Sequence, residues 1–215
     1  MTKYPVHLTE ERSAKIKKLA SNRQMGLAVL LENVHDPHNI GAVIRTCDAV
    51  GIPRVYLLVS DARVWDKIEL GINASSGARK WVDVYVYDDY AKCFAELRKH
   101  YDQILGTHLA QDSISLYDID FVKSTAIVLG NEHEGLTEEA LSYIDGNYII
   151  PQVGMVQSLN ISVAFAVSAY EALRQRSEAK LFNPEILSTE QEVLHQDYRQ
   201  RNLIQHKGDK ARIIK

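Results

Sequence analysis

Hydrophobic and polar positions follow one another along the chain in blocks that predict strands alternating with helices. Short apolar runs without clean alternation are typical of strands buried on both faces. Such runs cover 27–31, 54–59, 82–86, 103–107, 125–129 and a segment ending at Ile149-Ile150. Helices are predicted over 9–23, 39–50, 66–75, 89–100, 137–144 and 159–176. This order predicts an α/β fold, with a mostly parallel sheet and helices on both faces.

Several predicted helices begin with capping signals. Thr9, Asn39 and Thr137 each precede a helical segment and are good N-cap residues. Thr189 and Glu192 have the spacing of a capping box, which predicts one more helix near the C-terminus. Before it, Asn183-Pro184 marks the segment 180–188 as a linker.

The composition is that of an ordinary globular protein, with 46% hydrophobic and 25% charged residues in 215. No apolar run approaches the roughly 18 residues that a membrane helix needs, and the polar first residues do not resemble a signal peptide. Cys47 and Cys93 lie in separate predicted helices and form no metal-binding pair. We therefore expect a reduced, cytoplasmic location.

The net charge of −3 hides an uneven distribution. Residues 1–23 and 174–215 together carry 15 Lys and Arg against 8 Asp and Glu, whereas residues 24–173 carry 10 against 20. Two basic ends around an acidic centre fit either a surface that contacts RNA phosphates or simply solvated charged helices. The candidate RNA contacts are Arg12, Lys15, Lys18, Arg174 and Arg176.

Ligands of open α/β sheets usually bind in loops beyond the carboxyl ends of strands, which directs attention to 33–45, 130–136 and 150–160. In the first loop, His35 and His38 are too few for a metal site, and hydrogen-bonding roles are favoured. Arg45 has apolar neighbours in the following helix. It therefore either pairs with an acid or lines a cleft.

The other two loops also carry polar residues beyond what a turn requires. Gly130 and Gly135 bracket a polar turn that matches neither a P-loop nor a dinucleotide fingerprint. Ser158, Asn160 and Ser162 decorate the start of an apolar helix, although a cap needs only one of them. The polar residues beyond the one needed for a cap indicate hydrogen-bonding roles inside a binding site.

Taken together, 33–45, 129–135 and 150–164 resemble motifs 1, 2 and 3 of SPOUT methyltransferases, and more narrowly TrmH-type tRNA (guanosine-2′-O)-methyltransferases. Thr107-His108-Leu109 matches a fourth family segment, and the likeness runs from about residue 9 to 180. Motif 3 departs from the family at Gln152, where Met is common.

The resemblance implies a SPOUT domain over 25–178, with a trefoil knot at about 125–178, which composition alone could never show. Residues 1–24 and 179–215 would be basic helical extensions that hold tRNA. The resemblance also implies bound S-adenosylmethionine, a homodimer built around the active site, and guanosine 18 in the D-loop of tRNA as the target. No membrane or DNA partner is expected.

Carried over residue by residue, the resemblance assigns roles to the motif residues. Arg45 is credited with activating the ribose 2′-hydroxyl; since guanidinium groups keep their proton, we favour phosphate binding and stabilisation of the forming alkoxide. Asn39 would orient Arg45 or the ribose, and Glu132 would hold Arg45. Ser158 and Asn160 would position the nucleotide or the cofactor. The expected cofactor contacts are Thr107, Gly130, Ile150 and Leu159.

Two alternatives stay open. The same chemistry could act on ribosomal RNA or on another tRNA position. A protein of a different class, a non-catalytic RNA-binding protein on a SPOUT scaffold, is disfavoured because the motif residues are all present. The absent glycine fingerprint argues against a nucleotide-dependent oxidoreductase.

Overall fold

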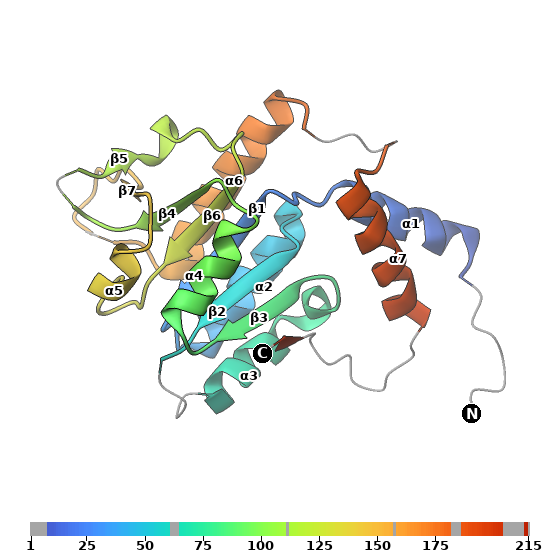
Figure 1. The fold of residues 1–215 in the computed structure, drawn as a ribbon, viewed down its shortest axis with the longest axis horizontal. Helices are drawn as coiled ribbons and strands as arrows, with labels where there is room; N and C mark the ends of the chain where they lie inside the picture. The colour runs from blue at the N-terminus through green and yellow to red at the C-terminus, as the bar shows by residue number, and fades with distance from the viewer. Residues whose placement is uncertain are drawn as a thin grey trace.

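The computed structural model describes residues 8–60, 65–110, 112–156, 158–181, 186–203 and 213–214. Its centre is an eight-stranded sheet with the order β5-β7-β4-β6-β1-β2-β3-β8, in which every strand pair is parallel (Figure 1). The strands are β1 (Leu27–Glu32), β2 (Arg54–Leu58), β3 (Asp83–Tyr87), β4 (Gln103–Thr107), β5 (Ile114–Ser115), β6 (Thr125–Leu129), β7 (Gly146–Ile149) and β8 (Ile213–Ile214). The predicted α/β class is confirmed.

Helices cover both faces of this sheet (Figure 1). They are α1 (Glu10–Ser21), α2 (Pro37–Val50), α3 (Trp65–Ala74), α4 (Tyr90–Arg98), α5 (Glu138–Leu141), α6 (Ile161–Glu178) and α7 (Thr189–Leu203), with short 3-10 helices η2 (Ser76–Lys80) and η3 (Leu116–Asp118). Successive residues of a strand point to opposite faces, so Leu27, Val29 and Leu31 pack with α2 and α6, while Ala28 and Leu30 pack with α4 and α5. This double burial explains why β1 is apolar from Leu27 to Leu31.

The start of α2 differs from the prediction. Asp36, not Asn39, is the N-cap, and its carboxylate accepts a hydrogen bond from the His38 amide at 2.8 Å. Pro37 occupies the first helical turn, where its missing N–H costs nothing. Asn39 is therefore not a cap: it lies inside the helix, buried, with its side-chain amide free for another partner.

Other boundaries shift by less. The capping box of α7 is formed by Ser188 and Gln191, one residue earlier than the predicted Thr189 and Glu192. The predicted helix 137–144 shortens to α5, capped by Thr137 as expected. The connection after β4 contains β5 and η3. The linker break Asn183-Pro184 and most of the C-terminal tail lie outside the described residues.

The two terminal helices form a separate small unit. Helices α1 and α7 lie side by side beyond the end of the sheet (Figure 1), and Ile16, Ala20 and Tyr198 form an apolar cluster between them. The unit falls within the extensions expected at the two chain ends. Within the described chain, every helix is too short or too polar to cross a membrane.

Candidate active site

The loops after β1 and β6 meet because these strands are neighbours in the sheet. The Asn39 side chain donates a hydrogen bond from Nδ2 to Glu132 Oε1 at 2.6 Å. Asn131 Nδ2 donates to the Asn33 carbonyl at 2.9 Å. Motifs 1 and 2 are thus joined at the carboxyl edge of the sheet, as the location of ligand sites in α/β folds predicts.

The predicted contact between Glu132 and Arg45 is wrong, because the Glu132 carboxylate accepts from Asn39 instead. Arg45 is exposed on α2 and forms no hydrogen bond or ion pair with the described residues. Its guanidinium, with five donors in a planar fork, is therefore available to a phosphate or to a developing oxyanion.

Gly130 serves the shape of the motif 2 loop. A Cβ atom at this position would lie 2.2 Å from the Gly135 carbonyl, so only glycine lets the hairpin close. Gly135 itself has φ +71°, a conformation that favours glycine. Gly130 is not among the described residues that line the pocket below, so its contact with the cofactor stays a prediction.

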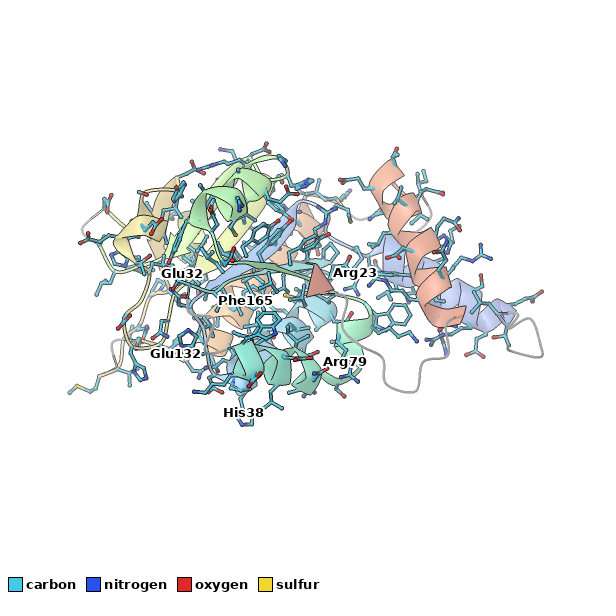
Figure 2. All side chains as sticks on the ribbon, turned by 60° about the horizontal axis from the view of Figure 1, so that its bottom comes forward. Arg23, Glu32, His38, Arg79, Glu132 and Phe165 are labelled. Atoms are coloured by element: carbon cyan, nitrogen blue, oxygen red, sulfur yellow. The ribbon has the colours of Figure 1, made fainter. Side chains whose placement is uncertain are left out.

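Glu32 is a buried carboxylate that the sequence interpretation missed. It accepts hydrogen bonds from Tyr90 Oη at 2.6 Å, from the Thr137 amide at 3.1 Å and from Thr137 Oγ1 at 2.5 Å. Burial and the hydrogen bond to Glu32 raise the pKa of Tyr90 to about 12, so its hydroxyl stays a donor. Glu32 and Glu132 lie toward the same end of the sheet, away from Arg23 (Figure 2). The sequence offered one sign of this buried carboxylate: Glu32 is the only acidic residue in an otherwise apolar strand and stands at its end.

A pocket of about 730 Å³ opens beyond the ends of β4 and β7. Its walls are Thr107, His108, Leu109, Tyr148, Ile149, Ile150, Pro151, Gln152, Val156, Ser158, Leu159 and Ala164. Three of the four expected cofactor contacts and Ser158 are therefore brought together, and Gln152, where motif 3 departs from the family, lies in the same wall. The pocket walls combine apolar surface with a few polar groups, which is typical of small-molecule sites.

Asn160 and Ser162 are bonded to each other at the start of α6. Asn160 is the N-cap, and its Oδ1 accepts from the Ser162 amide at 2.9 Å and from Ser162 Oγ at 2.6 Å. This accounts for two of the three polar residues in motif 3. Ser158, in the pocket wall, is the one left for a ligand.

The basic side chains predicted to contact RNA have different surroundings. Lys15 is paired with Glu11 at 2.6 Å, whereas the Lys18 ammonium has no ion pair with the described residues. Arg12 donates to Asn202 Oδ1 and lies over the Trp81 ring, 5.7 Å from its centroid.

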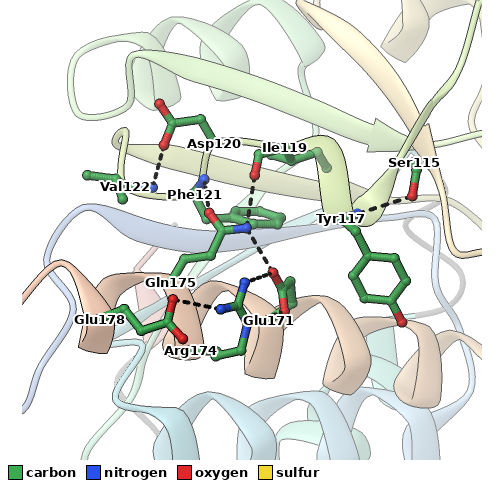
Figure 3. A network of polar contacts seen from close by, with 10 residues as sticks. All are labelled: Ser115, Tyr117, Ile119, Asp120, Phe121, Val122, Glu171, Arg174, Gln175 and Glu178. Carbon is green, nitrogen blue, oxygen red and sulfur yellow. Dashed lines mark hydrogen bonds and ion pairs between the residues drawn. The ribbon is translucent and has the colours of Figure 1, made fainter.

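Arg174 is exposed on α6 and forms ion pairs with Glu171 and Glu178 (Figure 3). The same figure shows Gln175 beside it, whose side chain accepts from the Phe121 amide and donates to the Ile119 carbonyl. Since both acids compete for the Arg174 guanidinium, its contact with RNA stays a prediction.

The RNA-contacting role predicted for Arg176 is corrected. Its side chain is buried, and the guanidinium donates to the carbonyl oxygens of Phe121, Gly26 and Lys123, each at 2.7 Å. Burial lowers its pKa to about 10. Arg176 is a structural residue that ties α6 to the ends of β1 and β6.

Comparison with known proteins identifies the family to which this chain belongs. The family model of the SpoU rRNA Methylase family matches residues 26–170. The tRNA (guanosine(18)-2'-O)-methyltransferase of Thermus thermophilus is 42% identical over 175 residues, covering 81% of this chain and 88% of the relative. The chain belongs to the SpoU family. The resemblance to TrmH-type SPOUT methyltransferases, drawn from three motifs, is thereby confirmed.

Two solved structures of this family agree with the fold. The A. aeolicus TrmH/SpoU tRNA modifying enzyme matches with a TM-score of 0.79 and 31% identity, covering 91% of this chain and 98% of that one. The AdoMet-bound rRNA methyltransferase from Sinorhizobium meliloti matches with a TM-score of 0.60 and 29% identity, covering 73% and 59%. Its homology to these enzymes makes this SpoU-family protein an RNA methyltransferase.

Proposed function

We propose that this SpoU-family protein transfers a methyl group from S-adenosylmethionine to the 2′-oxygen of a guanosine ribose in tRNA, at guanosine 18 of the D-loop. Two observations carry the proposal. The motif residues Asn39 and Glu132 are joined by a hydrogen bond, and Arg45, six residues after Asn39 on α2, is exposed and has no partner among the described residues. The chain is also similar along most of its length to a tRNA (guanosine(18)-2'-O)-methyltransferase.

The pocket beyond β4 and β7 fits the proposed cofactor. Leu109, Ile150 and Leu159 offer apolar surface for an adenine ring, while Thr107 and Ser158 offer hydroxyl groups. A volume of about 730 Å³ is within the range of cofactor sites. When bound, S-adenosylmethionine supplies a methyl group on an electrophilic sulfonium.

The motif residues would align and stabilise the reacting ribose. Arg45 would bind the phosphate beside the target ribose and stabilise negative charge on the 2′-oxygen as it forms. Asn39, fixed by Glu132, would orient the ribose rather than Arg45. Ser158 would position the nucleotide against the methyl donor, because methyl transfer requires in-line alignment. Asn160 would act through the helix start that it caps.

A homodimer, a trefoil knot over about 125–178 and a cytoplasmic location complete the proposal. Support for a second copy comes from apolar side chains exposed beside the pocket and along α6, at Val153, Met155, Val156, Val163 and Tyr170. Exposed apolar groups gathered next to a ligand site are typical of a protein interface.

The deciding experiment is transfer of labelled methyl from S-adenosylmethionine to unmodified tRNA transcripts, followed by nuclease mapping. We expect 2′-O-methylguanosine in the D-loop, and a transcript with guanosine 18 changed to adenosine should accept little methyl. Methylation elsewhere in tRNA, or of ribosomal RNA only, would keep the chemistry and reject the target. Absence of transfer to every RNA tested would reject the proposed function.

A further inference from the structure

A second pocket, distinct from the pocket beyond β4 and β7, lies between α1, the C-terminal end of α2 and α6. Its volume is about 540 Å³. We call it the α1–α2 pocket; the wall residues that matter below are Lys15, Lys18, Leu19, Arg23, Ala49 and Leu173. No residue of this pocket takes part in the proposed methyl transfer.

Buried contacts hold the walls of this pocket in place. Arg23 is 1% exposed, and its Nη2 donates to Asp48 Oδ1 at 2.6 Å. The same guanidinium donates from Nε to Tyr198 Oη at 3.0 Å, which ties α7 to α2. Gly51 approaches the Asn22 carbonyl so closely that a Cβ atom would lie 2.3 Å from it. The pocket is therefore fixed before any ligand arrives.

The charges along its walls favour an anion. Arg23 and Asp48 neutralise one another, which leaves the ammonium groups of Lys15 and Lys18. Glu11 pairs with Lys15, and Lys18 faces no ion-pair partner within the described residues. Apolar surface from Leu19 and Leu173 lies in the same pocket. Cationic groups beside apolar surface suit a phosphate attached to an uncharged ring.

The pocket lies on the same helical face as Arg45. Ala49, in the pocket wall, is four residues after Arg45 on α2, and both are exposed. Residues spaced by four share a helix face and lie about 6 Å apart along the axis. Neighbouring nucleotides of one RNA strand can span that distance.

We propose that the α1–α2 pocket receives a nucleotide of the substrate RNA next to the methylated one. Its phosphate lies at Lys18 and Lys15, and its sugar and base rest against Leu19, Ala49 and Leu173. The inference rests on the proposed function, since it assumes that Arg45 meets RNA. It adds a binding site for the strand that flanks the target.

Two variants of the full-length protein test this site by different means. Lys18→Ala removes a charge, and Ala49→Phe fills the pocket without changing any charge. Lys92→Ala is the matched control, because Lys92 is an exposed lysine of α4 on the opposite face of the sheet. Binding of tRNA is measured across a salt series, alongside S-adenosylmethionine binding and thermal unfolding.

We expect Lys18→Ala to weaken tRNA binding about tenfold and to lower the slope of log affinity against log salt by about 0.7 to 1. Ala49→Phe should weaken binding with an unchanged slope. Cofactor affinity and unfolding temperature should stay as in the wild type, a result that a purely structural role would not give.

Failure of this inference is distinguishable from failure of the proposed function. If the wild type methylates tRNA and both variants bind it like Lys92→Ala, the α1–α2 pocket does not hold RNA. A loss in Ala49→Phe accompanied by a lower unfolding temperature would also count against it. If the wild type methylates no RNA, the proposed function itself falls, and the pocket proposal with it.

Discussion

The candidate active site and the junction of α1 and α7 with the sheet use polar residues in opposite ways. At the active site, Arg45 is exposed and without a partner among the described residues, and Ser158 lines a pocket. At the junction, Arg23 is fully buried, and each of its three guanidinium nitrogens donates a hydrogen bond. Polar side chains without a partner in the fold are available to a ligand, whereas polar side chains with all their hydrogen bonds made hold the fold together.

The junction is a network rather than a pair. Tyr198 Oη accepts from Arg23 and donates to the Trp81 carbonyl. Arg201 donates to Asp83 Oδ1 at 2.7 Å, and Gln191 Nε2 donates to the Ser21 and Arg23 carbonyls, each at 3.0 Å. Such a network fixes one orientation of the terminal helices, since a half-satisfied version would leave buried polar groups unpaired.

Arg45→Ala should give the largest effect, and it should be confined to catalysis. Loss of an oxyanion-stabilising donor costs about 10²–10³ in turnover. S-adenosylmethionine affinity and the free energy of unfolding should be unchanged, because Arg45 is exposed and unpaired within the described chain. Single-turnover kinetics and calorimetry measure these quantities. Arg45→Lys keeps the charge but loses the planar fork, so it should restore only part of the rate. Lost cofactor binding would instead make Arg45 structural.

Arg23→Met should have the reverse profile. The Arg23 side chain is buried, and its partner Asp48 is 30% exposed. Removing the guanidinium leaves Asp48 and the buried Tyr198 hydroxyl without this donor, which should destabilise the protein by about 3 kcal/mol. Tyr198→Phe, which deletes one hydroxyl, should cost about 1 kcal/mol. Denaturant unfolding gives both values. Cofactor binding by the folded variants should be unaffected. A wild-type free energy of unfolding in Arg23→Met would show that the junction contributes nothing to stability.

Gly51→Ala should loosen the same junction through the backbone. Gly51 has φ +85°, and a Cβ atom would clash with the Asn22 carbonyl. Strain of this kind costs about 2 kcal/mol. Gly77→Ala is the control, because a Cβ atom there meets nothing within 4 Å. Thermal unfolding of the two variants should therefore separate; equal unfolding temperatures would contradict the clash.

The same contrast explains what could be predicted from the sequence. The strands followed from local apolar runs, and the motif residues followed from their fixed spacing, because both are local along the chain. Arg23 and Arg176 look like any other basic residue in the sequence; their burial depends on partners about 25 to 175 positions away. Asn39 was mistaken for a cap because Asp36-Pro37 competes for the same helix start. Glu132 was assigned to Arg45 from the family resemblance, which does not show that the Asn39 amide reaches its carboxylate across two neighbouring loops.

The smallest effect on stability should come from Asp145→Asn. Asp145 is paired with Arg98 outside both regions, and because this pair is partly exposed, its loss shows how little an exposed pair contributes. Asp145 Oδ2 accepts from Arg98 Nη1 at 2.5 Å and from the Ile104 amide at 2.7 Å. Burial raises the pKa of Asp145, but these two donors outweigh it, and the pKa lies below its ordinary value.

The folded state therefore binds the Asp145 proton more weakly than the unfolded state. The stabilisation is fully present above the unfolded pKa of about 3.9 and is lost as the pH falls through the lower, folded pKa. The Tm of Asp145→Asn should lie slightly below that of the wild type at pH 6, and the gap should close toward pH 3. A gap that stays constant would mean that the loss comes from altered hydrogen bonding and not from charge. If Asp145→Asn lost as much stability as Arg23→Met, buried and exposed pairs would contribute equally. The comparison of the two regions would then lose its basis.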